Sequence, residues 1–163
     1  MTDGSTLSVR ADFRIWIDAD ACPKGAKELV MRTAFRRNIG VTFVANSYMR
    51  LPDSELLELK LVDQGPDKAD DYIVETAAQA DIVVTADIPL AARLVRRGIM
   101  TLNPRGEEYS DSNIGERLAT RDLMEELRSA GTVTGGPKEY GSNDLRRFAN
   151  ALDRAVTRRS MGR

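Results

Sequence analysis

The chain has 163 residues, 42% of them hydrophobic and 30% charged, and its formal net charge is −1. This length and composition predict one globular domain with a substantial core and exclude two ordinary domains. Histidine is absent, which excludes Ser-His-Asp and Cys-His catalysis and zinc sites that contain histidine.

Residues 1–12 are polar, and we expect them to form a short disordered lead-in rather than a secretory signal. No run of 18 apolar residues occurs anywhere, so we expect no membrane span and no membrane partner. The single cysteine, Cys22, excludes an internal disulfide. A reducing compartment fits this usage, so the expected location is cytoplasmic.

The first half of the chain alternates strand and helix patterns. Apolar runs predict strands at Phe13–Ile17 and Val41–Ala45, and helical spacing predicts a helix over Lys24–Arg37 between them. The next stretch is harder to interpret. It indicates a short helix over Glu55–Leu59 and a brief strand at Leu61–Val62.

The alternation continues to about residue 102. A helix is predicted over Lys68–Ala80, a strand over Asp81–Thr85, a helix over Pro89–Arg97 and a strand over Ile99–Leu102. Strands that alternate with helices are typical of an α/β domain with a parallel sheet. We therefore expect a single α/β domain over residues 13–160 with a mainly parallel central sheet.

Beyond this point we expect a helix over Ile114–Ala130, a glycine-rich loop over Gly131–Gly141 and a last helix over Asn143–Arg158. Residues 141–163 contain six arginines and two aspartates, and a basic terminal helix can bind phosphates. The helical spacing alone favours an ordinary amphipathic helix. Its predicted core face consists of Leu145, Phe148, Leu152 and Val156.

Acidic residues follow two of the predicted strands. Asp18 comes directly after the first strand, Asp20 lies two residues later, and Asp87 follows the strand Asp81–Thr85. Ligands of parallel sheets bind beyond the carboxyl ends of the strands, and close carboxylates repel one another unless a cation or proton lies between them. These residues indicate a site for Mg²⁺ or Mn²⁺, although turn and cap roles stay open for each loop taken alone.

The pair Asp70 and Asp71 opens a predicted helix. The apolar face of that helix is formed by Ile73, Val74, Ala77 and Ala80. At 100° per residue Asp70 falls on this face and Asp71 at its flank. A buried aspartate is costly without a partner, and a cation shared with Asp18 and Asp87 would supply one. Asp71 is either a second ligand or part of an acidic first turn.

Polar and basic residues near the same sheet edge are candidates for substrate contacts. Thr85 could orient Asp87 through its hydroxyl or position a phosphate, although it could also simply end a strand. Lys24 and Arg105 could meet phosphate oxygens, although each alone is typical of a surface charge. Without histidine as a base, Cys22 is interpreted as a packed side chain.

Linked motifs along the chain resemble the YaiI/YqxD family of largely uncharacterised bacterial proteins. The resemblance covers nearly everything from Ile15 to the last helix. Its motifs are IWIDADACP (Ile15–Pro23), VAN (Val44–Asn46), DQGPDKADDYIV (Asp63–Val74), VVTADIPLA (Val83–Ala91), NPRGEEY (Asn103–Tyr109) and GGP (Gly135–Pro137). Asn46, the last residue of the second motif, is a further candidate contact for the substrate.

This family is in turn similar to the PIN-like nucleases, which cut RNA with carboxylate-bound Mg²⁺ or Mn²⁺. Asp18 matches the first acidic position of those nucleases, and Asp20 matches a nearby polar one. Asp70 matches the start of a D-x-x-I-x-x-x-A helix, and Thr85-x-Asp87 matches a T-x-D motif.

The resemblance implies a three-layer αβα sandwich and a metal-dependent nuclease that acts on RNA. It implies catalytic roles for Asp18, Asp70 and Asp87, with Asp20 and Asp71 as further candidate metal ligands. One departure concerns a glutamate that PIN-like nucleases carry in the central region. Only Glu55 or Glu58 could supply it here, and neither lies in a matching motif.

Two other functions stay open at this point. A HAD-like phosphatase would use Asp18 as nucleophile and Asp20 as general acid, but Cys22 replaces the expected Thr or Val and no lysine motif is evident. A non-catalytic module would use a degenerate site to bind RNA or a protein. The sequence also leaves open whether the chain forms a homodimer.

Overall fold

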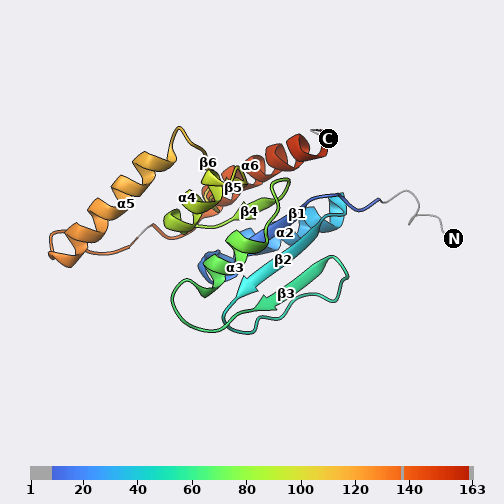
Figure 1. Cartoon of the computed structure of the whole chain (residues 1–163), viewed down its shortest axis with the longest axis horizontal. Helices are drawn as coiled ribbons and strands as arrows, with labels where there is room; N and C mark the ends of the chain where they lie inside the picture. The colour runs from blue at the N-terminus through green and yellow to red at the C-terminus, as the bar shows by residue number, and fades with distance from the viewer. Residues whose placement is uncertain (1–8, 137, 162–163) are drawn as a thin grey trace.

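A six-stranded sheet forms the centre of the protein (Figure 1). The structure, a computed structural model, describes residues 9–136 and 138–161. The strands lie in the order β3-β2-β1-β4-β5-β6, and all neighbours are parallel except β5 and β6. Their bounds are β1 Arg14–Asp18, β2 Gly40–Ala45, β3 Leu57–Leu61, β4 Ile82–Val84, β5 Met100–Leu102 and β6 Glu108–Tyr109.

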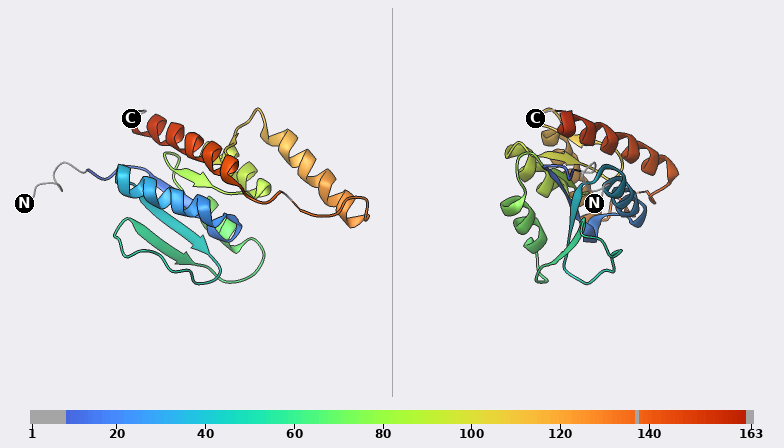
Figure 2. Two further views of the ribbon diagram at one scale, coloured as in Figure 1. Left: turned by 180° about the vertical axis from the view of Figure 1, so that it is seen from behind. Right: turned by 90° about the vertical axis from the view of Figure 1, so that its right-hand side faces the viewer.

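Helices cover both faces of this sheet. On one face α2 (Lys24–Arg37) and α6 (Ser142–Met161) lie side by side, as Figure 2 shows from behind. On the other face lie α3 (Lys68–Thr76) and α4 (Ile88–Arg96). The protein is therefore a three-layer αβα sandwich with a mainly parallel sheet, as predicted.

Strand β1 contributes to both cores of the sandwich. Ile15 and Ile17 pack in the core beneath α2 and α6, whereas Trp16 between them packs in the core beneath α3 and α4. Successive side chains of a strand point to opposite faces, so a strand covered on both sides needs a continuous apolar run. This is why FRIWI indicates a buried strand so clearly.

The chain changes its direction of travel across the sheet between β1 and β4. It first builds β1, β2 and β3 toward one edge, and then α3 carries it back to β4 on the other side of β1. The loops after β1 and β4 consequently diverge, which leaves a crevice where such sheets bind ligands. Asp18 is the last residue of β1, and Asp87 is the N-cap of α4.

Three predicted elements were wrong in type or extent, and one strand was missed. The segment predicted as a helix over Glu55–Leu59 is instead a turn followed by edge strand β3, whose Leu57 and Leu59 pair with β2. The strand predicted at Leu61–Val62 overlaps β3 only at Leu61. Charged residues alternate with leucine in this half-exposed strand, which is the pattern of a strand with one covered face and which the helical interpretation overlooked. Strand β6 lies where no element was predicted, and α3 ends at Thr76 rather than at Ala80.

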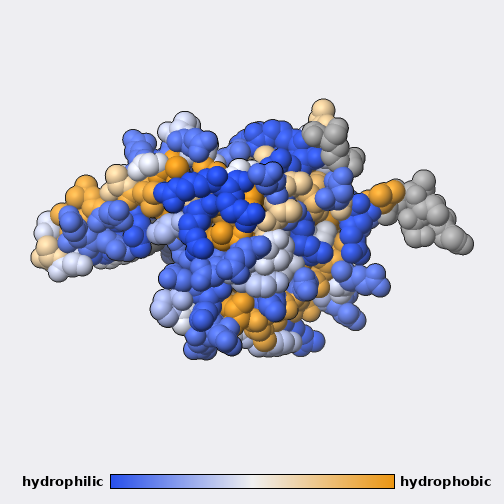
Figure 3. Space-filling model, viewed as in Figure 1, coloured by the Kyte–Doolittle hydropathy of each residue, from blue (hydrophilic) through white to orange (hydrophobic). Residues whose placement is uncertain are grey.

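The two C-terminal helices differ in how they pack: α6 buries one face, and α5 (Ile114–Ser129) extends away from the sandwich. Phe148, Leu152 and Val156 of α6 are buried, as its predicted core face requires. Helix α5 packs against α4, buries none of its residues fully and extends away from the sandwich (Figure 1). A space-filling view shows hydrophobic residues along one edge of this extension (Figure 3).

No helix in the described ranges is long and apolar enough to cross a membrane. Of the predicted lead-in, residues 1–8 lie outside the described residues, and so does Pro137 of the GGP motif. Residues 9–12 form neither helix nor strand, and the backbone N–H of Ala11 donates to the carbonyl of Asn38 at 3.0 Å.

Candidate metal centre

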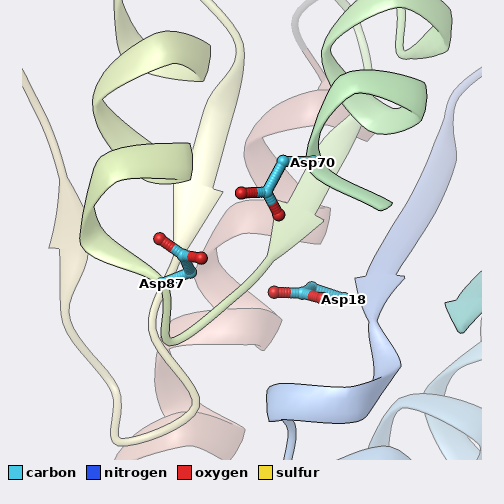
Figure 4. Close-up of side chains that lie close together, drawn as sticks. All are labelled: Asp18, Asp70 and Asp87. Carbon is cyan, nitrogen blue, oxygen red and sulfur yellow. The ribbon is translucent and has the colours of Figure 1, made fainter. Parts of the chain in front are cut away.

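Three aspartates from separate elements converge at the crevice between β1 and β4. One carboxylate oxygen from each of Asp18, Asp70 and Asp87 lies within 4.8 Å of the others. Figure 4 shows the three side chains pointing toward one another from the end of β1, the start of α3 and the start of α4. These are the three residues for which the resemblance to PIN-like nucleases implies catalytic roles.

A buried threonine fixes Asp18. The Asp18 side chain ends β1 at 5% exposure, and its Oδ2 accepts a hydrogen bond from Oγ1 of Thr85 at 2.8 Å. The same Thr85 oxygen accepts a hydrogen bond from the backbone N–H of Asp87 at 2.9 Å. The predicted hydroxyl bond to Asp87 is therefore made to its backbone, and the carboxylate that Thr85 orients is that of Asp18.

Asp87 is both a helix cap and a member of the cluster. Its Oδ1 accepts a hydrogen bond from the backbone N–H of Leu90 at 3.1 Å, and Pro89 lies in the first turn of α4. An aspartate cap uses one carboxylate oxygen for the helix, which leaves the second for another partner. Asp87 can therefore cap α4 and bind a cation at the same time.

Asp70 lies in the first turn of α3 and points into the crevice. Ile73 and Ala77, three and seven residues later, are buried on the same helical face. Burial, together with the nearby carboxylates of Asp87 and Asp18, raises the pKa of Asp70 to about 6. The charged form of this residue is therefore disfavoured where it stands.

Burial is also the main reason why the pKa of Asp18 lies above its ordinary value. The hydrogen bond from Thr85 opposes this rise, and the charges of Asp87 and Asp20 add to it. Two of the three clustered carboxylates thus resist ionisation, which a shared cation would relieve. All three offer oxygen, the ligand atom that Mg²⁺ and Mn²⁺ prefer, so the residues fit such an ion.

The cluster lies in a cleft of about 260 Å³ that contains six aspartates. Its lining consists of Asp18, Asp20, Ala21, Asn46, Asp63, Gly65, Asp67, Lys68, Ala69, Asp70 and Asp87. Asp63 and Asp67 had no predicted role. Asp63 follows β3 by two residues, as Asp20 follows β1, and it directly follows the strand predicted at Leu61–Val62, so this strand end is a signal that could have identified it.

The remaining predicted ligands are held by other partners. Oδ2 of Asp20 accepts a hydrogen bond from the backbone N–H of Asn46 at 2.9 Å, so both residues line the cleft without joining the group of three. Oδ1 of Asp71 pairs with Arg93 of α4 at 2.9 Å. Asp71 lies outside the cleft lining, where it ties α3 to α4.

The predicted basic contacts lie farther from the cluster. Lys24 is exposed at the start of α2 and does not line the cleft. Arg105 pairs with Asp144 at 2.9 Å, also donates to the carbonyl of Lys138, and lies over the ring of Tyr140. Its contacts are those of a residue that holds the loop before α6 in place.

Cys22 is a packed side chain, as predicted. It is 7% exposed within the core beneath α2. Burial raises the pKa of its thiol to about 12, so the nucleophilic thiolate is strongly disfavoured.

Comparison with known sequences identifies relatives that match most of the chain. The family model described as "Uncharacterized BCR, YaiI/YqxD family" matches residues 16–158. A "UPF0178 protein" of Trichlorobacter lovleyi is 54% identical over 144 residues, which cover 88% of this chain and 94% of the relative. A "UPF0178 protein" of Geobacter metallireducens is 52% identical over 146 residues, covering 90% of this chain and 94% of the relative. No solved structure matches.

Proposed function

This chain belongs to the YaiI/YqxD family, and we propose that it is a divalent-metal-dependent phosphodiesterase that cleaves RNA. The observation that carries the proposal is the convergence of Asp18, Asp70 and Asp87 within 4.8 Å at the crevice of a parallel sheet. Such a cluster is unfavourable for stability when it is empty and charged, so a role in binding a cation explains it best.

When bound, Mg²⁺ or Mn²⁺ would lower the pKa of a water molecule and offset the charge that develops on a phosphate. Asp18, Asp70 and Asp87 would hold the ion. The hydroxyl of Thr85 orients the Asp18 carboxylate, and the first turn of α4 orients that of Asp87. Ligands fixed in this way need little rearrangement on binding, which favours precise positioning of substrate and water.

RNA as the substrate rests on the resemblance to PIN-like nucleases. Asn46 lines the acidic cleft and is a candidate contact for the substrate. Lys24, at the exposed start of α2, is a candidate for the more distant phosphates. With one buried cysteine, the chain suits a reducing cytoplasm, where we expect this reaction to occur.

A cleavage assay tests the proposal. Wild-type protein should cut an end-labelled single-stranded RNA in Mn²⁺ and should stop when EDTA is added. Asp18→Asn and Asp87→Asn should each lower the rate by about 100-fold or more, because removing one charged group from a catalytic site costs several kcal/mol. Asp53→Asn, at an exposed position outside the cleft lining, is the matched control. Cleavage that persists unchanged in Asp18→Asn would refute the proposal.

The geometry favours this reaction over a phosphatase. In a HAD-like mechanism Asp20 would serve as the general acid, but its carboxylate is bonded to the backbone of Asn46 and lies outside the group of three. Trapping with beryllofluoride distinguishes the two reactions, because only the phosphatase forms a phospho-aspartate at Asp18. RNA binding without cleavage would instead identify a non-catalytic module.

A further inference from the structure

A second hollow adjoins the aspartate cluster. Its volume is about 320 Å³, and its walls come from the loop after β4, the first turn of α4, the 3-10 turn after β1 and helix α5. The lining residues are Ala21, Ala86, Asp87, Ile88, Pro89 and Arg121. Ala21 and Asp87 belong to the acidic cleft as well, so the two spaces meet at a candidate metal ligand.

The two spaces differ sharply in charge. The acidic cleft extends over the ends of β1, β2 and β3 and presents six aspartates against one lysine, Lys68. A nucleic-acid backbone would be repelled along most of that side. The hollow lies over the end of β4 and offers one aspartate, one arginine and four small or apolar residues. This side therefore suits a nucleoside with its attached phosphate better than the acidic cleft does.

Arg121 is the polar group that gives the hollow specificity. Its Nη2 pairs with Oε2 of Glu125 at 2.8 Å and its Nη1 with Oδ1 of Asp122 at 3.1 Å, both on the same helix. The Arg121 side chain is 37% exposed, and the side chains of both partners are more than half exposed. A guanidinium can stack on a base with its face and donate to a phosphate with its edge.

We infer that this hollow binds the nucleoside next to the phosphodiester bond that is cut in single-stranded RNA, a step that rests on the proposed function. The base lies against Ile88 and Pro89, and Arg121 stacks on it or donates to its phosphate. The volume suits one such group, since pockets for small ligands begin at about 300 Å³. Because Asp87 lines both spaces, the phosphate attached to this nucleoside lies beside the aspartate cluster.

Kinetics with an RNA hexanucleotide in Mn²⁺ form the first part of the test. Ala86→Leu fills the hollow and Arg121→Gln removes its cation. Each should raise KM by about 10-fold with less than a threefold change in kcat, the expected result when binding is lost without loss of the metal ligands. Arg128→Gln, on the same helix but outside the hollow, should leave KM unchanged. Thermal melting shows that each variant is folded.

Titration with adenosine 5′-monophosphate, followed by NMR without metal, separates this inference from the proposed function. Amide shifts should centre on Ala21, Ala86 and Ile88 in wild-type protein and disappear in Arg121→Gln. If wild-type protein does not cleave RNA, the proposed function fails and this titration alone decides whether the hollow binds nucleotides. If cleavage occurs but both variants keep the wild-type KM, or if the shifts lie elsewhere, the hollow is not the nucleoside site.

Discussion

Oγ1 of Thr85 donates a 2.8 Å hydrogen bond to Oδ2 of Asp18, and this single contact joins the ends of the two strands that flank the crevice. The Thr85 side chain is completely buried, so water cannot replace it. The hydroxyl also accepts the backbone N–H of Asp87, which fixes the start of α4 relative to β1. The positions of two clustered carboxylates thus depend on one hydroxyl group.

Replacing Thr85 with valine should weaken both folding and metal binding. The change removes a buried hydrogen bond from Asp18 and leaves the N–H of Asp87 without its acceptor, which should lower the free energy of unfolding by about 1–3 kcal/mol. Mn²⁺ affinity should fall by about 10-fold, the size of effect seen when a group that orients a metal ligand is lost. Urea denaturation and calorimetric titration measure the two effects.

Thr101→Val is the matched control for this variant. Thr101 is also completely buried, and its hydroxyl donates to the carbonyl of Ile99 at 3.0 Å, away from the cluster. It should lose stability but keep Mn²⁺ affinity. Equal affinity in the two variants would show that Thr85 does not position the cluster.

Replacing Asp70 with asparagine should stabilise the metal-free protein and abolish its response to Mn²⁺. The change removes a partly buried charge that Asp87 and Asp18 repel, so the free energy of unfolding at about pH 8 should rise by about 1 kcal/mol. Added Mn²⁺ should raise the melting temperature of wild-type protein by mass action, and that of Asp70→Asn by much less. Asp53→Asn should behave like wild-type protein in both measurements.

The raised pKa of Asp70 leads to a prediction of how the stability of the metal-free protein depends on pH. Burial raises the pKa of Asp70 from its ordinary 3.8 to about 6 in the folded state. Between these values the folded protein holds a proton that the unfolded chain has released, so stability falls as pH rises. The stabilisation from this bound proton is fully present below pH 3.8 and is lost above about pH 6. The stability gap between Asp70→Asn and wild-type protein should therefore widen from about pH 4 to about pH 7, and urea denaturation across this range would reveal a constant gap if Asp70 is not the cause.

Asp71 should prove dispensable for the metal. It pairs with Arg93 at the surface and does not line the cleft, so Asp71→Asn should change Mn²⁺ affinity by less than about threefold. Half-exposed pairs of this kind contribute about 1 kcal/mol or less, so stability should change little. Calorimetric titration of Asp71→Asn beside Asp87→Asn measures this difference. A similar loss of affinity in both would place Asp71 among the ligands.

The sequence predicts those parts of the fold in which one physical signal dominates. The continuous apolar run of β1 and the helical spacing of α2 match the structure closely, because both elements are packed firmly against the core. Of strand β3 only Leu61 falls in a predicted strand, because an edge strand has one neighbour and one poorly covered face and therefore lacks a continuous apolar run. Its alternation of leucine with charged residues is a strand pattern, but its pairing with β2 is a tertiary interaction.

The candidate site, too, could be predicted only in part from the sequence. Strand ends identify Asp18 and Asp87, and helical phase selects Asp70 over Asp71, so the three converging residues are accessible to sequence reasoning. Asp63 also follows a strand end, whereas the position of Asp67 in the cleft depends on where the loop after β3 lies, which local pattern does not specify. The ion pairs of Arg105 with Asp144 and of Asp71 with Arg93 join residues 39 and 22 positions apart and follow from tertiary packing alone.

Anomalous diffraction from a crystal soaked in Mn²⁺ tests the central claim most directly. A cation site built by Asp18, Asp70 and Asp87 predicts an anomalous peak between their carboxylates, and predicts its loss in a crystal of Asp70→Asn soaked in the same way. A map from well-diffracting wild-type crystals with no peak at this position, or with Mn²⁺ bound only elsewhere, would contradict the account.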